Sequence, residues 1–207
     1  KCDIRKFFAS VDHKILETVL EKYISDENIL WLLGQVIKSF HSEGEQGVGL
    51  PLGNLTSQLL VNVYMNEFDR FVKNELRARF YIRYADDFLF PSSDKSYLEK
   101  LLPQVEGFLL EKLLLSLHPI KVEIETLSSG TDFLGWVNFP YHGVLRTTTK
   151  RRMLKNINAS TSAASLASYS GMLNHGSTLN LRREIERKRL SDRFDIKKSP
   201  GPATIAG

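Results

Sequence analysis

Apolar residues recur every three or four positions over four stretches of the chain, and this spacing predicts amphipathic helices. Residues that favour helix N-caps precede two of the stretches, Ser25 or Asp26 before one and Ser93 or Asp94 before another. The helices are expected at residues 13–23, 28–40, about 56–76 and 96–114. From residue 148 onward the pattern is again helical, with breaks near 160–164 and 174–177.

Short runs of aromatic and β-branched residues lie between these helices and are typical of strands. They are expected at residues 1–8, 80–82, 88–90, 121–126, 131–139 and 143–146. Residues 41–53 hold four glycines and predict a loop. The order of elements predicts a mixed α/β (α+β) fold in which an antiparallel sheet is backed by helices and is followed by a helical region.

The segment Tyr84-Ala85-Asp86-Asp87 places two adjacent carboxylates between two predicted strands. A hairpin would carry both at its tip, where like charges repel unless a cation neutralises them. A solvated turn without further function is the alternative. Asp3, in the first predicted strand, can approach Asp86 only if their strands are neighbours in one sheet. Carboxylates that converge from separate strands are what a two-Mg²⁺ phosphoryl-transfer site needs.

Five segments resemble, in the right order, the motifs of reverse transcriptases of the prokaryotic branch that includes group II intron, retron and diversity-generating enzymes. They are Asp3-Ile4-Arg5-Lys6-Phe7-Phe8-Ala9-Ser10-Val11-Asp12-His13 (motif A), Gly49-Leu50-Pro51-Leu52-Gly53-Asn54-Leu55-Thr56-Ser57-Gln58 (motif B), Tyr84-Ala85-Asp86-Asp87 (motif C), Leu117-His118-Pro119-Ile120-Lys121 (motif D) and Phe133-Leu134-Gly135-Trp136 (motif E, the primer grip). The resemblance implies a reverse-transcriptase palm over residues 1–146, a basic helical thumb over 147–198 and a flexible tail over 199–207.

The resemblance also implies RNA-directed DNA synthesis by two-metal-ion nucleotidyl transfer. Two Mg²⁺ ions, which Mn²⁺ can replace, would be held by the carboxylates of Asp3, Asp86 and Asp87 and by the backbone carbonyl of Ile4. Lys121 would protonate or neutralise the leaving pyrophosphate; a solvated lysine at a strand edge is the alternative. The substrates would be dNTPs, a template RNA and a primer or cDNA duplex.

Further residues take roles in substrate binding by resemblance. Phe8 matches the steric gate that selects dNTPs, and simple core packing is its alternative. Gly53 would let the backbone approach the nucleotide closely. Contacts to primer and template are expected from Tyr84, Phe133, Leu134, Gly135 and Trp136.

Motif B departs from the Pro-Gln-Gly and Ser-Pro pattern of most of these enzymes, because it reads Pro51-Leu52-Gly53 and then Ser57-Gln58. Both departures, Leu52 and Gln58, are similar to the diversity-generating retroelement type, whose members copy with errors mainly opposite template adenine. An apolar side chain at position 52 removes a polar contact that penalises mispairs. Neutral drift at this position, a group II intron-like or defence-type enzyme, and a nucleic-acid-binding module without catalysis stay open as alternatives.

Charge is distributed unevenly along the chain. Residues 1–145 carry 15 Lys/Arg against 20 Asp/Glu, and residues 146–207 carry 13 against 4, so net charges of −5 and +9 make up the total of +4. The basic segment is expected to follow nucleic-acid phosphates, with a solvated helix face as the alternative. Its two clusters are Arg146, Lys150, Arg151, Arg152 and Lys155, then Arg182, Arg183, Arg187, Lys188 and Arg189.

The remaining composition restricts the setting. The single cysteine, Cys2, excludes an internal disulfide and fits a reducing cytoplasm, and no apolar run is long enough for a membrane span. The family carries a fingers region before motif A, whereas this sequence starts with motif A. The chain is therefore expected to be a fragment that polymerises poorly by itself. The resemblance also implies an accessory RNA-binding protein.

Overall fold

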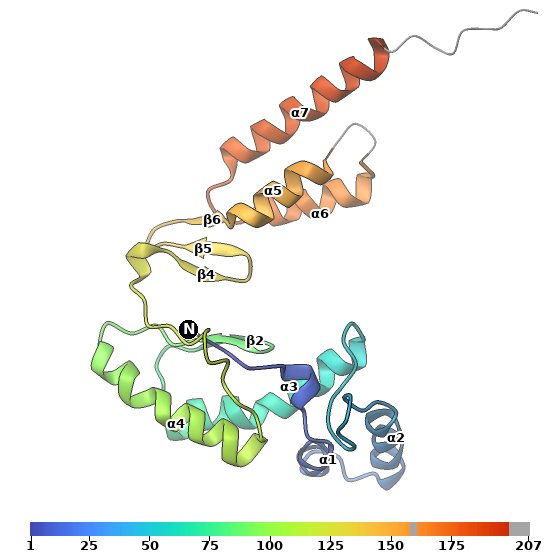
Figure 1. Cartoon of the computed structure of the whole chain (residues 1–207), viewed down its shortest axis with the longest axis vertical. Helices are drawn as coiled ribbons and strands as arrows, with labels where there is room; N and C mark the ends of the chain where they lie inside the picture. Colours follow the sequence, from blue (N-terminus) through green and yellow to red (C-terminus); the bar gives the residue numbers. More distant parts are fainter. Residues whose placement is uncertain (158–160, 199–207) are drawn as a thin grey trace, which may run out of the picture. The chain divides into compact units, whose positions relative to one another are not determined.

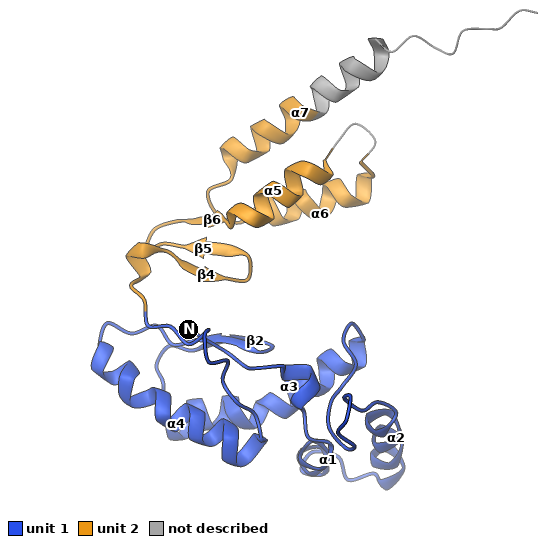
Figure 2. Cartoon of the chain, viewed as in Figure 1, with its two compact units in different colours: residues 1–124 blue, residues 125–207 orange. Residues whose placement is uncertain are grey.

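The computed structural model describes residues 1–157 and 161–198, with side chains up to residue 188. It divides into two compact units, residues 1–124 and residues 125–207, which are coloured separately in Figure 2. Mixed α/β structure with small antiparallel sheets is confirmed. The palm and thumb boundary at residues 146 and 147 stays a prediction, and the predicted tail at 199–207 lies outside the described residues.

The first unit contains a three-stranded antiparallel sheet and four α-helices, with α3 and α4 on one side of the sheet (Figure 1). The elements are β1 (Cys2–Asp3), the 3₁₀ helix η1 (Phe7–Ser10), α1 (His13–Glu21), α2 (Glu27–Lys38), α3 (Leu55–Arg70), the π-helical turn η2 (Phe71–Glu75), β2 (Ile82–Tyr84), β3 (Asp87–Leu89) and α4 (Lys95–Leu113). The strand order is β1-β3-β2. The strands of Asp3 and of the Asp-Asp pair are therefore neighbours, as the hypothesis of a joint site required.

Aromatic rings join the sheet to the helices beneath it. Phe68 on α3 packs against Phe88 on β3 with ring centroids 5.1 Å apart, and against Phe108 on α4 at 6.1 Å. Phe68 and Phe88 are fully buried. Because large aromatic side chains bury much apolar surface and interlock, these ring contacts pack strand β3 against α3.

Local signals for helix starts are confirmed. Asp26 accepts hydrogen bonds from the Asn28 and Ile29 N–H groups at the start of α2, and Asp94 accepts one from Tyr97 N–H at the start of α4. A side-chain acceptor at this position satisfies N–H groups that have no partner within the helix. At each of these two helix starts the N-cap is therefore the aspartate and not the serine that precedes it.

Three predicted strands differ in the structure. The strand over residues 1–8 ends at Asp3, because Lys6 has a positive φ of 47° and the chain then turns into η1. Residues 121–126 form no strand, and the predicted strand over 131–139 is instead a hairpin. Leu134 and Gly135 both have positive φ, 54° and 82°, and this reverses the chain within two residues.

The described residues of the second unit form a small sheet, one 3₁₀ helix and three α-helices. Its elements are the 3₁₀ helix η3 (Leu127–Ser129), β4 (Thr131–Phe133), β5 (Trp136–Asn138), β6 (Gly143–Leu145), α5 (Thr147–Asn156), α6 (Ala163–Leu173) and α7 (Leu179–Lys198). The core is formed by Leu145, Met153, Ile157, Leu173, Leu181 and Ile185. Gly176, at φ 73°, lies so close to Trp136 that a Cβ atom there would overlap the indole ring.

Candidate active site

Strand pairing brings the motif A and motif C carboxylates side by side. Asp3 on β1 lies directly opposite Asp87 on β3, and Asp87 is also opposite Tyr84 on β2. Directly opposed residues of antiparallel strands have Cβ atoms about 4.5–5.5 Å apart. Two carboxylates from segments far apart in the sequence thus come from adjacent strands.

The turn between β2 and β3 contains only Ala85 and Asp86, since Tyr84 and Asp87 pair across it. Ala85 has a positive φ of 52° and Asp86 does not, which is the pattern of a type II′ hairpin turn. Glycine is the usual residue at this position because an alanine Cβ disfavours it. Asp86 therefore lies in the turn, whereas Asp87 already belongs to the strand.

Lys121 contacts the same carboxylate cluster. Its Nζ lies 2.9 Å from Oδ2 of Asp3, which is buried with 8% of its surface exposed. The Asp3 carbonyl accepts a hydrogen bond from His118 N–H at 2.8 Å, which ties the motif D segment to β1. The predicted cation of motif D is thus an ion-pair partner of the predicted metal ligand of motif A.

The four charged groups influence one another. The pKa of the Asp86 carboxyl is raised, first because the turn partly buries it and further because Asp3 and Asp87 are nearby, whereas Lys121 lowers it. The pKa of Lys121 is raised, first by its hydrogen bond to Asp3 and further by all three acids. Like charges held together in this way attract a cation.

The donor chemistry of this cluster fits a divalent metal ion, because carboxylate oxygens are the ligands that Mg²⁺ prefers. Among the residues that the structure describes, however, no three His, Cys, Asp or Glu side chains are gathered as ligands of one ion. Lys121 binds Asp3 instead. The strands thus supply neighbouring carboxylates, and the ammonium group of Lys121 supplies the neutralising charge.

Ile4, whose carbonyl is a predicted metal ligand, is buried next to this cluster and forms an isolated antiparallel bridge with Leu117. The hydrogen bonds that flank the bridge run from Arg5 N–H to the Ser116 carbonyl and from His118 N–H to the Asp3 carbonyl. The Ile4 carbonyl takes part in neither of them.

Backbone hydrogen bonds join motif B to motif A. Leu50 N–H donates to the Phe8 carbonyl at 2.8 Å, and Gly49 N–H donates to the Val11 carbonyl at 2.8 Å. The two phenylalanines of motif A differ in burial, because Phe7 is buried whereas Phe8 is only half-buried. Phe8 is therefore not a fully buried core residue.

The two positions at which motif B departs from the usual pattern, Leu52 and Gln58, lie on the surface. Leu52 is 78% exposed, and Gln58, in the first turn of α3, is also exposed. Gly53 has φ 88°, and a Cβ atom there would meet nothing within 4 Å. Its backbone conformation therefore requires glycine, and the space beside it is open.

Arg83, whose guanidinium donates to the carbonyl of Ala85 in the motif C turn, is a residue that the sequence predictions did not single out. It lies on β2 between the exposed residues Ile82 and Tyr84, and its guanidinium pairs with Asp69 on α3 at 2.6 Å. The signal that could have found it is the two-residue period of strands, which directs Tyr81 and Arg83 to the face opposite Ile82 and Tyr84.

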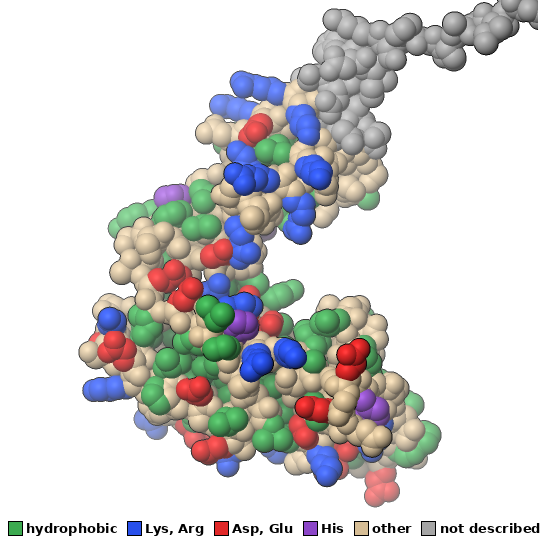
Figure 3. Space-filling view, in the orientation of Figure 1, with side chains coloured by type: hydrophobic (Ala, Val, Ile, Leu, Met, Phe, Trp, Pro, Cys, Tyr) green, Lys and Arg blue, Asp and Glu red, His purple; other side chains and the backbone are tan. Residues whose placement is uncertain are grey.

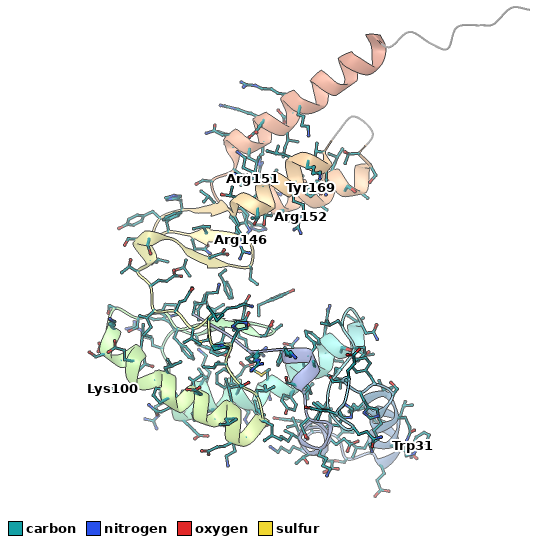
Figure 4. All side chains as sticks on the ribbon, viewed as in Figure 1. Trp31, Lys100, Arg146, Arg151, Arg152 and Tyr169 are labelled. Atoms are coloured by element: carbon teal, nitrogen blue, oxygen red, sulfur yellow. The ribbon has the colours of Figure 1, made fainter. Side chains whose placement is uncertain are left out.

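The motif E residues and the predicted thumb cations belong to the second unit. Phe133 pairs with Trp136 across the turn formed by Leu134 and Gly135. Arg151, Arg152 and Lys155 are exposed on α5, where Figure 4 labels the two arginines. Lysine and arginine side chains gather over the helices of this unit (Figure 3). The side chain of Arg189 lies outside the described residues.

Some basic residues of the second unit have protein partners. Lys150 pairs with Glu184 at 3.0 Å, Arg146 pairs with Asp132, and Lys188 donates to the Leu154 carbonyl. The exposed cations Arg151, Arg152 and Lys155 are thus different residues from the cations that form these internal contacts. No helix within the described residues has the length and apolar character needed to cross a membrane.

Comparison with known proteins agrees with this geometry. The family model described as reverse transcriptase (RNA-dependent DNA polymerase) matches residues 1–138, which is two thirds of the chain. The chain belongs to the reverse transcriptase family. Members of this family use a nucleic-acid template, dNTPs and divalent metal ions. The match includes motifs A to E, from Asp3 to Trp136.

Among curated proteins, the chain is similar to Protein YkfC of Escherichia coli K12, with 28% identity over 169 residues, or 64% of the chain and 44% of that protein. It is also similar to the putative COX1/OXI3 intron 2 protein of Saccharomyces cerevisiae, with 25% identity over 85 residues, 39% of the chain and 10% of that protein. An uncharacterized 91 kDa protein in the cob intron of Schizosaccharomyces pombe is 29% identical over 82 residues. The chain thus spans less than half of the length of each of these relatives.

Proposed function

We propose that this chain is the catalytic core of an RNA-directed DNA polymerase that copies a template RNA into cDNA. The observation that carries the proposal is the direct opposition of Asp3 and Asp87 on neighbouring strands, with Asp86 in the adjoining turn and Lys121 paired to Asp3. In this family, carboxylates from separate strands serve nucleotidyl transfer between a primer end and a dNTP.

Asp3, Asp86, Asp87 and the Ile4 carbonyl would hold two Mg²⁺ ions, or Mn²⁺ in their place. Ions bound there supply the charge that activates the primer hydroxyl and stabilises the departing pyrophosphate. Lys121 supplies a second positive charge for the pyrophosphate. Its raised pKa keeps it protonated, so it neutralises charge more readily than it gives up a proton.

Surface residues of both units are assigned to binding and selecting the substrates. The half-buried ring of Phe8 is available to pack under the sugar, where it would exclude a ribose 2′-hydroxyl. The open space beside Gly53 lets a nucleotide approach the backbone. Tyr84, 65% exposed, and the hairpin from Phe133 to Trp136 contact primer and template. Arg151, Arg152 and Lys155 contact phosphates of the duplex.

Within the family we assign the chain to the diversity-generating retroelement type, whose enzymes copy with errors and work with an accessory RNA-binding protein. Support comes from Leu52 and Gln58, both exposed at motif B. A hydrogen-bonding side chain at position 52 would penalise mispairs, because a poorly placed base leaves such a group unpaired. Leu52 cannot exert this penalty.

An intron-type reverse transcriptase is the second candidate. Two relatives, the putative COX1/OXI3 intron 2 protein and the 91 kDa protein in the cob intron, carry an intron in their names. The carboxylate cluster would have the same role in the diversity-generating and the intron-type enzyme. The error rate of copying therefore distinguishes the two types.

Primer extension on an RNA template tests the activity, using the complete gene product with Mg²⁺ and dNTPs. The parent protein is expected to extend the primer, and Asp86→Asn is expected to abolish extension while leaving binding to an RNA–DNA duplex nearly intact. Equal extension by both proteins would contradict the assignment of Asp86. Duplex binding without any extension by the parent would favour a binding module.

Sequencing of the products tests the subtype. The parent is expected to misincorporate mainly opposite template adenine, and Leu52→Gln is expected to lower this error rate because it restores a polar group at the nascent pair. Leu55→Gln is a matched control, since Leu55 is equally exposed but lies outside the departures in motif B. Accurate copying by the parent would favour the intron-type candidate.

A further inference from the structure

We propose that Arg83 is a positioning residue that fixes the turn carrying Asp86 to helix α3. The inference rests on the proposed polymerase function, because it assigns Arg83 to the placement of a carboxylate of that site. Arg83 does not itself contact the carboxylate cluster; it acts through the backbone of Ala85.

Two parallel hydrogen bonds anchor the guanidinium to α3. Nε of Arg83 donates to Oδ1 of Asp69 at 2.8 Å, and Nη2 donates to Oδ2 at 2.6 Å. Tyr81 O–H donates to the same Oδ1 at 2.7 Å. Bidentate pairs of this kind combine strength with a defined orientation, and only 9% of the Arg83 side chain is exposed.

The remaining arm of the guanidinium reaches the turn. Nη1 donates to the Ala85 carbonyl at 3.1 Å and to Oδ1 of Asn62 on α3 at 3.2 Å. One planar group thus joins two positions of α3 to the carbonyl that precedes Asp86. Because this carbonyl belongs to the peptide group between Ala85 and Asp86, the bond fixes the plane from which Asp86 projects.

Ala85 needs such support, because its φ of 52° is disfavoured for a residue with a Cβ atom. The burial that holds Arg83 in place would by itself lower its pKa, but the hydrogen bonds and charge of Asp69 raise it. The guanidinium therefore stays charged and keeps all its donors. A lysine could not replace it, since one ammonium cannot form both parallel bonds to Asp69 and reach Ala85 as well.

The test measures Mn²⁺ binding by calorimetry and single-nucleotide extension kinetics on the complete gene product. In Arg83→Lys, both Mn²⁺ affinity and kcat are expected to fall by about ten-fold, the size of effect typical for residues that orient metal ligands. The KM for dNTP is expected to change much less. Lys22→Gln is the matched control, because it removes an ion pair to Glu67 on the same helix that does not involve the turn.

A merely structural role for Arg83 would lower the melting temperature but leave the Mn²⁺ affinity and kcat of the folded protein unchanged, and this result would overturn the proposal. If Arg83→Lys does not fold, Asp69→Asn provides the test, because it keeps the side-chain volume at position 69 and weakens the hydrogen bonds that hold the Arg83 guanidinium. It is expected to reduce Mn²⁺ affinity and kcat several-fold, and parent-like values would overturn the proposal.

Comparison of the parent with Asp86→Ala distinguishes a failure of the proposed polymerase function from a failure of the positioning role of Arg83. If the parent extends no primer, the proposed function fails. If Asp86→Ala binds Mn²⁺ and extends primers as well as an active parent does, the assignment of Asp86 fails, and the positioning role of Arg83 fails with it. If Asp86→Ala is inactive while Arg83→Lys matches the parent, the polymerase assignment stands and only the positioning role of Arg83 is excluded.

Discussion

At the scale of single residues, the contact between Lys121 and Asp3 has two consequences. The ammonium neutralises a buried carboxylate that also faces Asp87 across the sheet. The same ammonium contacts an oxygen that the proposed metal ion would need, so on the proposed assignment Lys121 would compete with metal at Asp3. More than half of the Lys121 side chain is exposed, and an ion pair of this kind contributes at most about 1 kcal/mol to stability.

We expect Lys121→Met to bind Mn²⁺ more tightly than the parent, by up to about ten-fold, because removal of a competing positive charge favours the metal. Extension is expected to slow, since the charge beside the pyrophosphate is lost. Calorimetric titration with Mn²⁺ measures the first effect. Lys100→Met, on the exposed face of α4, is the control. Unchanged or weaker Mn²⁺ binding would show that the pair does not compete with metal.

At the scale of elements, helix α4 has a favourable cap at its start and a strained residue directly after its end. α4 begins with a side-chain cap from Asp94 and ends at Leu113, and its C-cap residue Leu114 has a positive φ of 49°. Glycine is the usual residue in this conformation after a helix. Leu114 is 57% exposed, so little packing is lost when its side chain is removed.

We expect Leu114→Gly to raise the free energy of unfolding by about 0.5–1 kcal/mol, because relief of the left-handed strain exceeds the entropy that glycine adds to the unfolded chain. Leu110→Gly is the matched control, since Leu110 is similarly exposed but lies within α4. It is expected to lower stability by about 1 kcal/mol. Urea unfolding followed by circular dichroism measures both. A loss of stability in Leu114→Gly would contradict the prediction.

At the scale of the whole molecule, the acidic and basic parts of the chain carry different chemistry. The acidic region contains the carboxylate cluster and its paired lysine, and the basic region contains the exposed cations of α5. Nucleic-acid binding by such cations releases counterions and therefore weakens as salt rises.

Neutralisation of Arg151, Arg152 and Lys155 by glutamine is expected to weaken duplex binding and to reduce the slope of log affinity against log salt by up to about three, one for each phosphate contact. Fluorescence anisotropy at several salt concentrations measures the slope. The control neutralises three exposed lysines of the first unit, Lys14, Lys100 and Lys112. An equal loss of slope in the control would point to net charge rather than to α5.

Much of the local structure was predictable, and the errors have physical causes. The hairpin at motif C and the caps at Asp26 and Asp94 depend on a few neighbouring residues, which the sequence displays. The prediction of a strand over residues 1–8 was wrong because Lys6 takes a left-handed conformation, which the residue types of this segment do not predict. The strand over 131–139 was wrong because the Leu134-Gly135 turn interrupts an apolar run.

The sequence by itself determined the kinds of chemical groups and their order, namely the carboxylates of Asp3, Asp86 and Asp87, the cation of Lys121 and a basic segment after them. The family was indicated by the resemblance of five ordered segments to the motifs of reverse transcriptases, and the family model over residues 1–138 confirms it. Only the tertiary structure decided that Asp3 opposes Asp87, that Lys121 pairs with Asp3, and that Arg83 joins Asp69 to Ala85. Apart from the bond between Arg83 and Ala85, these contacts link residues that are 14 or more positions apart, and such pairings depend on strand register and core packing rather than on local preference.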